Sequence, residues 1–260
     1  MPNYTTVLGA VLLLSWGSSA LEDEKRALDI PEPAPQPRRI GSRQPLVVTL
    51  VRYEGGTPGR DHYPHALPEL IDYFEQTTRV ITPVRWNEMR LDDPRIKDSH
   101  LLYLTGSGVR LQIDETSRRN LGHYLHQGGM MYAEEIRPSG LGLTAAVGAT
   151  PFERQFKALI RDDLVLGSSG TDWQSIKRGH PLFHSYFEFP DGPPMGFGAG
   201  ADAAGLEILE VRGRPAVILS TLNISWFWGD TQAEARDRGL QFGCNLFVYA
   251  MAQRAAISTE

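Results

Sequence analysis

Apolar residues along this chain gather in short runs that predict β-strands. Most of these runs are nearly continuous and rich in Val, Leu, Ile, Tyr and Met, which is typical of strands buried on both faces of a parallel sheet. Two later runs flank Gly213-Arg214-Pro215, and this arrangement predicts a β-hairpin. The predicted strands cover residues 46–53, 79–84, 100–105, 130–133, 206–212 and 216–221.

Between these runs, apolar residues recur at the three- and four-residue spacing of amphipathic helices. The predicted helices cover residues 65–77, 114–127, 151–160 and 232–254. The segment 166–204 is rich in Gly, Pro and aromatic residues and predicts long loops. Strands that alternate with helices favour a parallel sheet with helices on both faces. We therefore expect a single doubly wound, mostly parallel α/β domain over residues 44–255, with a C-terminal β-hairpin and a closing helix.

The first 43 residues have the sequence patterns of a targeting signal and a linker. Residues 7–14 form an apolar run, and small residues follow it up to Ala20, which is typical of a secretory signal peptide over residues 1–20. The run is short for a membrane span, which needs about 20 residues. Because no Lys or Arg precedes it, an uncleaved anchor over residues 7–17 is the alternative. Residues 21–43 are charged and Pro-rich, which predicts a linker to an exported, periplasmic or secreted domain.

Composition and charge exclude several classes of protein. Hydrophobic residues make up 41% of the chain and charged residues 22%, as in ordinary globular proteins. The net charge of -5 argues against a nucleic-acid binder. The single cysteine, Cys244, lies in an apolar stretch, so neither an internal disulfide nor cysteine-based catalysis is expected. Phosphate-loop, dinucleotide and zinc motifs are absent from the sequence, so we expect no cofactor and no dedicated metal site.

Polar residues follow several predicted strands, where open parallel sheets form their ligand sites. Tyr53 follows the first strand, Ser107 follows the third, and Glu134 and Glu135 end the fourth. A carboxylate there can act as a general base, a metal ligand or an acceptor for a sugar hydroxyl. The structural alternative is that Glu134 and Glu135 are a pair of solvated loop residues. Ser107 lacks the G-x-S-x-G spacing of a nucleophile turn, so we interpret it as a ligand contact.

Further candidates lie later in the chain. His180 and Asp230 are candidate acids or orienting partners for the two strand-end carboxylates, and a metal bound by those carboxylates with His180 or His184 is a variant of this hypothesis. Trp226 and Trp228 form a candidate stacking platform, because aromatic faces suit the apolar faces of pyranose rings. Simple packing of these tryptophans over the sheet edge is the alternative.

The order and spacing of several segments resemble a known bacterial family. The segments are Arg52–Gly56, His100–Gly108, Gly128–Glu135, His180–Phe187, Gly192–Pro194 and Gly243–Ala250. Together, over residues 46–254, they resemble an exported or membrane-tethered domain-of-unknown-function family with a class I glutamine amidotransferase-like (flavodoxin-like) fold. The resemblance implies that fold, and members commonly show an acidic pair where this chain has Glu134-Glu135.

The resemblance implies little about chemistry. Members often have a histidine where this chain has Ser107, which weakens a catalytic role for that loop. Amidotransferases proper place a cysteine in a nucleophile elbow, and this sequence has nothing comparable, so glutamine hydrolysis is not implied. Related domains include trehalose-utilisation-like proteins and an accessory domain of β-galactosidases, which suggests a carbohydrate link by analogy only.

Two hypotheses from different classes follow. The first is a non-catalytic module of the cell envelope that binds a carbohydrate or an envelope protein. The second is a hydrolase of a glycan or related polar substrate, with Glu134 or Glu135 as the general base. Burial of one carboxylate within hydrogen-bond range of a Tyr or His would favour the hydrolase, whereas exposure of both would remove its base.

Overall fold

A computed structural model of the chain describes residues 44–56, 58, 60–107, 111–136, 151–199 and 205–257. All of them belong to the unit Arg39–Glu260. The signal peptide and linker predicted for residues 1–43 lie outside the described residues.

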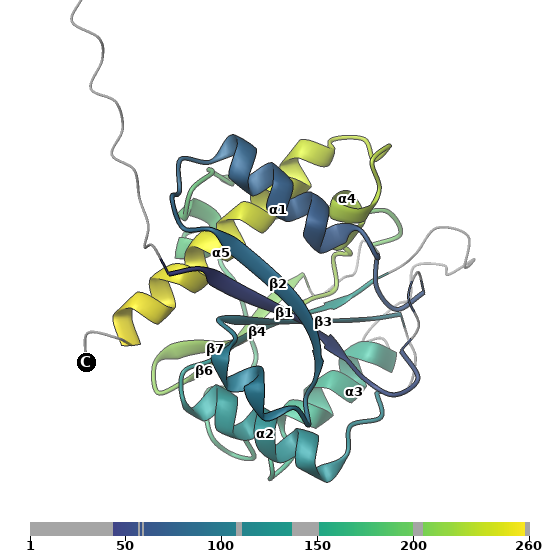
Figure 1. Ribbon diagram of the computed structural model, residues 1–260, viewed down its shortest axis with the longest axis vertical. Helices are drawn as coiled ribbons and strands as arrows, with labels where there is room; N and C mark the ends of the chain where they lie inside the picture. The colour runs from purple at the N-terminus through teal and green to yellow at the C-terminus, as the bar shows by residue number, and fades with distance from the viewer. Residues whose placement is uncertain are drawn as a thin grey trace, which may run out of the picture. The chain divides into compact units, whose positions relative to one another are not determined.

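Within the described ranges, the strands form one seven-stranded sheet in the order β2-β1-β3-β4-β7-β6-β5 (Figure 1). Neighbouring strands from β2 to β7 pair in parallel, whereas β6 pairs antiparallel with both β7 and β5. The predicted mostly parallel α/β sheet is therefore confirmed, and β6 and β7 form the predicted antiparallel pair. The strands are β1 (Leu46–Arg52), β2 (Val84–Arg90), β3 (Leu101–Gly106), β4 (Met130–Glu135), β5 (Gln174–Ser175), β6 (Leu206–Val211) and β7 (Arg214–Ser220).

Helices cover both faces of this sheet (Figure 1). Side chains alternate along each strand, so β3 sends Leu101 and Tyr103 into one core and Leu102 and Leu104 into the other. Burial on both faces explains the continuous apolar run of this strand. Helices α1 (Ala66–Thr77), α4 (Ser225–Gly229) and α5 (Arg236–Ile257) pack into the first core, and α2 (Glu115–His126) and α3 (Pro151–Ile160) pack into the second.

The ends of α2 follow from two local signals in the sequence. Asp114 precedes the helix, and its Oδ1 accepts a hydrogen bond of 2.8 Å from the N–H of Ser117, which caps the first turn. Gly128 follows the helix with φ of 89°, a left-handed conformation that glycine adopts without strain. The helix predicted over 114–127 therefore matches the observed one to within a residue at each end.

The middle of helix α5 is buried, because it packs into the first core with α1, α4 and the short helix η2 (Pro181–His184) around it. The helical spacing predicts an inward stripe of Leu240, Cys244, Phe247, Val248 and Met251. Phe242, Leu246 and Tyr249 are buried as well, so that stripe is too narrow. Two glycines permit close approach: a Cβ on Gly243 would lie 2.4 Å from Leu70, and one on Gly239 would lie 2.2 Å from Phe227. None of the helices in the described ranges combines the length and the hydrophobicity that a membrane crossing requires.

Three of the predicted elements are corrected by the structure. The strand predicted at 79–84 is wrong, because β2 spans Val84–Arg90. This strand pairs only with β1 and lies at the edge of the sheet, so it tolerates the polar residues that hid it. The segment Ser225–Gly229, which lies outside the predicted helices, is the short helix α4, and the closing helix begins at Arg236 rather than at residue 232.

Candidate functional site

The carboxyl ends of β1, β3, β4 and β7 lie side by side, as parallel pairing requires. Tyr53 follows β1, Ser107 follows β3, Glu134 and Glu135 end β4, and residues 221–225 follow β7. These residues, with the loops that pack on them, are termed the carboxyl edge. The sequence correctly placed its strand-end candidates at one edge of the sheet.

Glu134 is fully buried, and its carboxylate accepts five hydrogen bonds. Oε1 accepts from the hydroxyls of Tyr132 (2.9 Å) and Ser220 (2.8 Å) and from the N–H of Ile224 (2.7 Å). Oε2 accepts from the N–H of Ser225 (2.7 Å) and from the Ser225 hydroxyl. Burial raises the pKa of Glu134, and the hydrogen bonds oppose that shift because they favour the carboxylate. The side chain thereby fastens β4 to the β7–α4 turn.

Aromatic residues enclose this carboxylate from the first core. The Tyr103 hydroxyl donates to Ser225 Oγ at 2.6 Å, and the Tyr103 ring stacks on Tyr132 with centroids 6.1 Å apart. Trp228 packs against both rings, is 1% exposed, and donates its Nε1–H to the Gly239 carbonyl at 2.8 Å. The structure therefore places Trp228 in the core, where it is not accessible as half of a stacking platform.

A second polar cluster lies at the ends of β1 and β3. The Ser107 hydroxyl donates to Asp61 Oδ1 at 2.8 Å, and the Thr105 hydroxyl donates to the Asp61 carbonyl at 2.7 Å. The Tyr53 hydroxyl donates to the Thr105 carbonyl at 3.0 Å. Residues of this cluster enclose a void of about 10 Å³, which is close to the space of one water molecule. Ser107 is thus positioned as a donor to a carboxylate.

Arg52 closes the outer side of this cluster. Its guanidinium binds Glu88 through two hydrogen bonds, of 2.7 and 2.9 Å, and also contacts the ring of His62. Burial, followed by the charge of Arg52, lowers the pKa of His62 to about 4. The ring is therefore neutral at pH 7 and serves as a packed polar group.

Residues 192–199 dock against the β7–α4 turn through their main chain. The Gly196 N–H donates to the Leu222 carbonyl at 2.8 Å, and Asn223 Nδ2 donates to the Phe197 carbonyl at 2.7 Å. A Cβ on Gly196 would lie 1.9 Å from the Asn223 carbonyl oxygen, so only glycine allows this approach. The Gly-Pro-rich segment is therefore a fixed part of the carboxyl edge.

The docked segment presents apolar side chains to solvent. Phe197 is 58% exposed and Met195 52% exposed. The Phe197 ring lies 5.9 Å from that of half-buried Trp226. Met195, Phe197 and Trp226 are termed the apolar rim. Of the two predicted stacking tryptophans, only Trp226 belongs to it.

His180 and Asp230 do not join Glu134. Asp230 ends α4, and its Oδ1 accepts from the N–H of Gln232 at 2.9 Å. His180 caps the short helix η2 (Pro181–His184) and packs on Tyr249 with ring centroids 5.4 Å apart. Tyr249 lies roughly 20 Å further along α5 than the start of that helix, which contacts α4. His180 is therefore far from the carboxyl edge.

The segment that follows His180 is bound to α5 through the buried Asn245. Asn245 Oδ1 accepts from the N–H groups of Tyr186 (3.2 Å) and Phe187 (2.7 Å). Its Nδ2 donates to the carbonyls of Leu182 (2.9 Å) and Phe187 (2.8 Å). Two of the segments that carried the family resemblance thus bind each other, which gives them a structural role.

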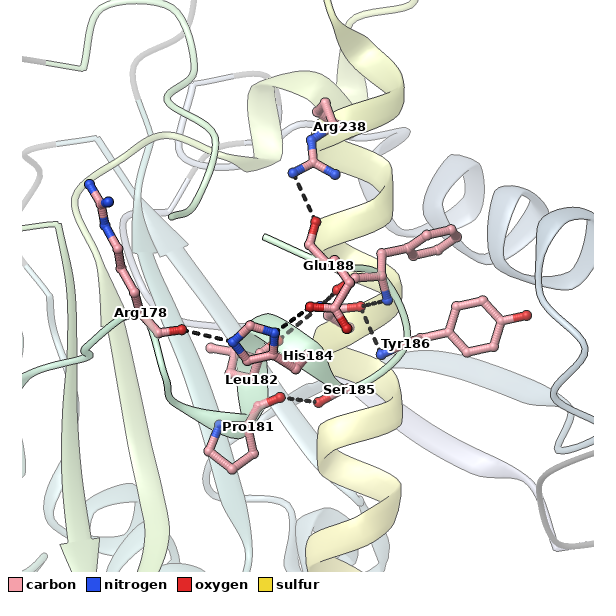
Figure 2. A network of polar contacts seen from close by, with 10 residues as sticks. Arg178, Pro181, Leu182, His184, Ser185, Tyr186, Glu188 and Arg238 are labelled. Carbon is pink, nitrogen blue, oxygen red and sulfur yellow. Dashed lines mark hydrogen bonds and ion pairs between the residues drawn. The ribbon is translucent and has the colours of Figure 1, made fainter. Parts of the chain in front are cut away.

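His184 lies on the outer side of the same segment, with acceptors at both ring nitrogens (Figure 2). Nδ1 lies 2.5 Å from Glu188 Oε2, and Nε2 lies 2.9 Å from the Arg178 carbonyl. Both nitrogens donate only in the imidazolium form. The hydrogen bond to Glu188, followed by that to Arg178, raises the pKa of His184 above its ordinary value of 6.5.

Glu135 is buried on the opposite side of β4 from Glu134, as adjacent strand residues must be. In the part of the chain that the structure describes, no three His, Cys, Asp or Glu side chains form a group that could hold a metal ion. The two carboxylates of the acidic pair therefore lie on opposite faces of the sheet.

Sequence reasoning missed several residues of the carboxyl edge. Asn223 and Ser225 follow β7 directly, so the strand-end rule that identified Ser107 could have found them. Asp61 lies well beyond the end of β1, in a loop without a motif, and the sequence carries no signal for it. Tyr103 also has no signal in the sequence, because it lies within an apolar strand.

The comparisons with known proteins identify a family. Residues 47–251 match the family described as Domain of unknown function (DUF4159), and this range includes both polar clusters and the apolar rim. No curated protein matches the chain. Because the match covers well over half of the sequence, the chain belongs to the DUF4159 family.

Proposed function

We propose that this domain is a non-catalytic binding module whose ligand contacts the carboxyl edge. The observation that carries the proposal is the saturation of Glu134 by five donors. The contact with Tyr132 meets the burial criterion for a hydrolase, yet a general base also needs a lone pair aimed at the substrate. A carboxylate offers about four lone-pair sites, and the fold uses them all.

The strand order supports the location and the finer fold assignment. The order β2-β1-β3-β4-β7 corresponds to the 2-1-3-4-5 order of flavodoxin-like sheets, which is consistent with the proposed glutamine amidotransferase-like fold. In that order the switch point lies between β1 and β3, next to Asp61 and Ser107. Because the void there holds about one water, the ligand would rest on the edge rather than enter a deep pocket.

The apolar rim favours a carbohydrate as the ligand. An exposed Phe197 beside Trp226 offers aromatic surface to the apolar face of a sugar ring. Ser107 Oγ, at the same edge, donates its proton to Asp61 and can still accept from a sugar hydroxyl. A signal peptide and a Pro-rich linker, as predicted for residues 1–43, would place such a module in the cell envelope. An envelope protein is the partner to test if sugars fail.

Thermal-shift titration of the full chain with neutral oligosaccharides and peptidoglycan disaccharide fragments tests the proposal. A sugar at a hundred times its Kd should add about 2.7 kcal/mol to the free energy of unfolding. Phe197→Ala should abolish this shift while leaving the Tm of the free protein nearly unchanged, because the side chain is largely exposed.

Trp86→Ala is the matched control, because Trp86 is an exposed aromatic residue, 38% exposed, on the edge strand β2. It should retain the full shift. Absence of a shift with every sugar would contradict the carbohydrate assignment, and release of hydrolysis products would contradict the non-catalytic one.

A further inference from the structure

The short helix α4 ends in a carboxylate beside the apolar rim. Asp230 directly follows α4, and its N–H donates to the Trp226 carbonyl at 2.9 Å. Residues four apart in a helical turn share one face of the helix, with Cβ atoms about 5–6 Å apart. Both side chains are half-buried, so part of each is open to solvent. A ligand that stacks on the rim would therefore meet this carboxylate.

The negative charge of Asp230 is not paired with a cation in the part of the chain that the structure describes. Its Oδ1 accepts from the N–H of Gln232 at 2.9 Å. The next arginine along the chain is committed elsewhere, because Arg236 Nη2 donates to Glu69 Oε2 at 2.9 Å and its Nε donates to the Phe227 carbonyl at 3.1 Å. Among the described residues, none donates to Oδ2 of Asp230, so this oxygen is available to a ligand.

The aromatic rings of the rim favour the same charge on a ligand. The face of an aromatic ring carries partial negative charge and attracts a cation that lies over it. The planes of Phe197 and Trp226 are tilted by 38°, and Phe197 is largely exposed, so its ring is open to a ligand. The rim and Asp230 together therefore suit a ligand that combines an apolar face with a positive charge.

A neutral sugar would use only part of this arrangement. Its hydroxyls can donate to Asp230, but they bring no charge to offset the carboxylate or to interact with the ring faces. An anionic sugar would be repelled by the carboxylate. An ammonium group supplies three donors and a full positive charge, so an amino sugar matches both the rings and the carboxylate.

We propose that the apolar rim and Asp230 bind a hexosamine unit whose amine is free and protonated. The apolar face of the sugar ring would stack on Phe197 and Trp226, and the ammonium group would donate to Asp230 Oδ2. This inference rests on the carbohydrate-binding function proposed above and specifies the class of sugar for the same site. Asp230 thereby determines which sugar the rim prefers.

The test is isothermal titration calorimetry of the full chain at pH 6.0 and constant ionic strength, with two β-1,4-linked trisaccharides. Chitosan trisaccharide has a protonated amine on each ring at this pH, and cellotriose has a hydroxyl at the same positions. Chitosan trisaccharide should bind at least about fivefold more tightly, because it adds an ion pair and a cation–π contact at a partly exposed site.

Asp230→Asn removes the charge, but the amide oxygen can still accept from the Gln232 N–H, so the turn is preserved. The preference for chitosan trisaccharide should fall to within about twofold, with little change in the affinity for cellotriose. The control Asp98→Asn changes the net charge equally at an exposed aspartate that ends η1 (Pro94–Asp98), before the start of β3. It should retain the full preference.

Two results would overturn this inference and leave the carbohydrate function standing. They are equal affinity for the two trisaccharides, and a preference that survives in Asp230→Asn, which would reflect only the negative net charge of the chain. Phe197→Ala should abolish binding of both trisaccharides, and binding that persists in this variant would also overturn the inference. Failure of both trisaccharides to bind overturns it as well, whereas failure of every sugar in the thermal-shift series contradicts the carbohydrate assignment itself.

Discussion

The two edges of the sheet use their polar residues in opposite ways. At the carboxyl edge, the fold surrounds the Glu134 carboxylate with donors, and Asp61 with Thr105 lines a void of only about 10 Å³. At the amino edge, where β3 and β4 begin, Lys97 and Arg254 are among the residues that line a cavity of about 200 Å³. A polar residue at a strand end thus contributes to binding only through the hydrogen-bonding capacity that the fold leaves unused.

The largest effect should follow from Glu134→Gln at the carboxyl edge. The amide would direct its NH₂ group at main-chain N–H groups of residues 224 or 225, which leaves buried donors without acceptors. We expect the free energy of unfolding to fall by about 3 kcal/mol. Chemical denaturation measures this loss.

Glu54→Gln is the control for that variant, because Glu54 is exposed and lies after β1 at the same edge. It should change the free energy of unfolding by less than about 0.5 kcal/mol. A loss below about 1 kcal/mol in Glu134→Gln would mean that the carboxylate is not a structural anchor and would restore it as a candidate base.

A smaller effect should follow from Tyr124→Phe at the amino edge. The variant removes a buried hydroxyl that makes two hydrogen bonds with Met130. Because the adjacent cavity admits water, which can replace the hydroxyl, we expect a loss of about 1 kcal/mol. Denaturation of the two variants side by side measures the contrast between the edges, and equal losses would contradict it.

The smallest effect should come from His184, which lies away from both edges. Its pKa is raised in the folded chain, so its hydrogen bonds stabilise the fold below the ordinary value of 6.5, and this contribution is lost as pH rises through the folded pKa. NMR titration of the imidazole measures that pKa. Glu188→Gln should lower it, and an unchanged value would show that the pair with Glu188 does not form in solution.

The fold was largely predictable because most strands and helices bury regular apolar patterns. Residues 101–104 are apolar throughout, and Asp114 and Gly128 mark the limits of α2. The edge strand β2 was missed, because pairing on one side only leaves no such pattern. The breadth of burial around α5 was also missed, since it depends on packing between layers distant in sequence.

The position of the candidate site was predictable from the sequence, but the burial and the hydrogen bonds of its residues were not. The strand-end rule brought Ser107 and Glu134 to one edge of the sheet, whereas His180 was wrongly grouped with them, because nothing in the sequence shows that its segment binds the middle of α5. The amino-edge cavity left no motif at all. Its cations come from segments more than 100 residues apart, so only the fold assembles them.

The contacts of Glu134 also constrain the order of folding. Its donors at Ser220, Ile224 and Ser225 lie 86, 90 and 91 residues further along the chain. The carboxylate remains hydrated until β7 docks beside β4, so closing this long loop must precede the burial of the charge. Glu134→Gln should therefore speed unfolding far more than it slows refolding, with a φ-value near zero. The hydrogen bonds of Glu134 thus form late in folding, after the central strands have assembled.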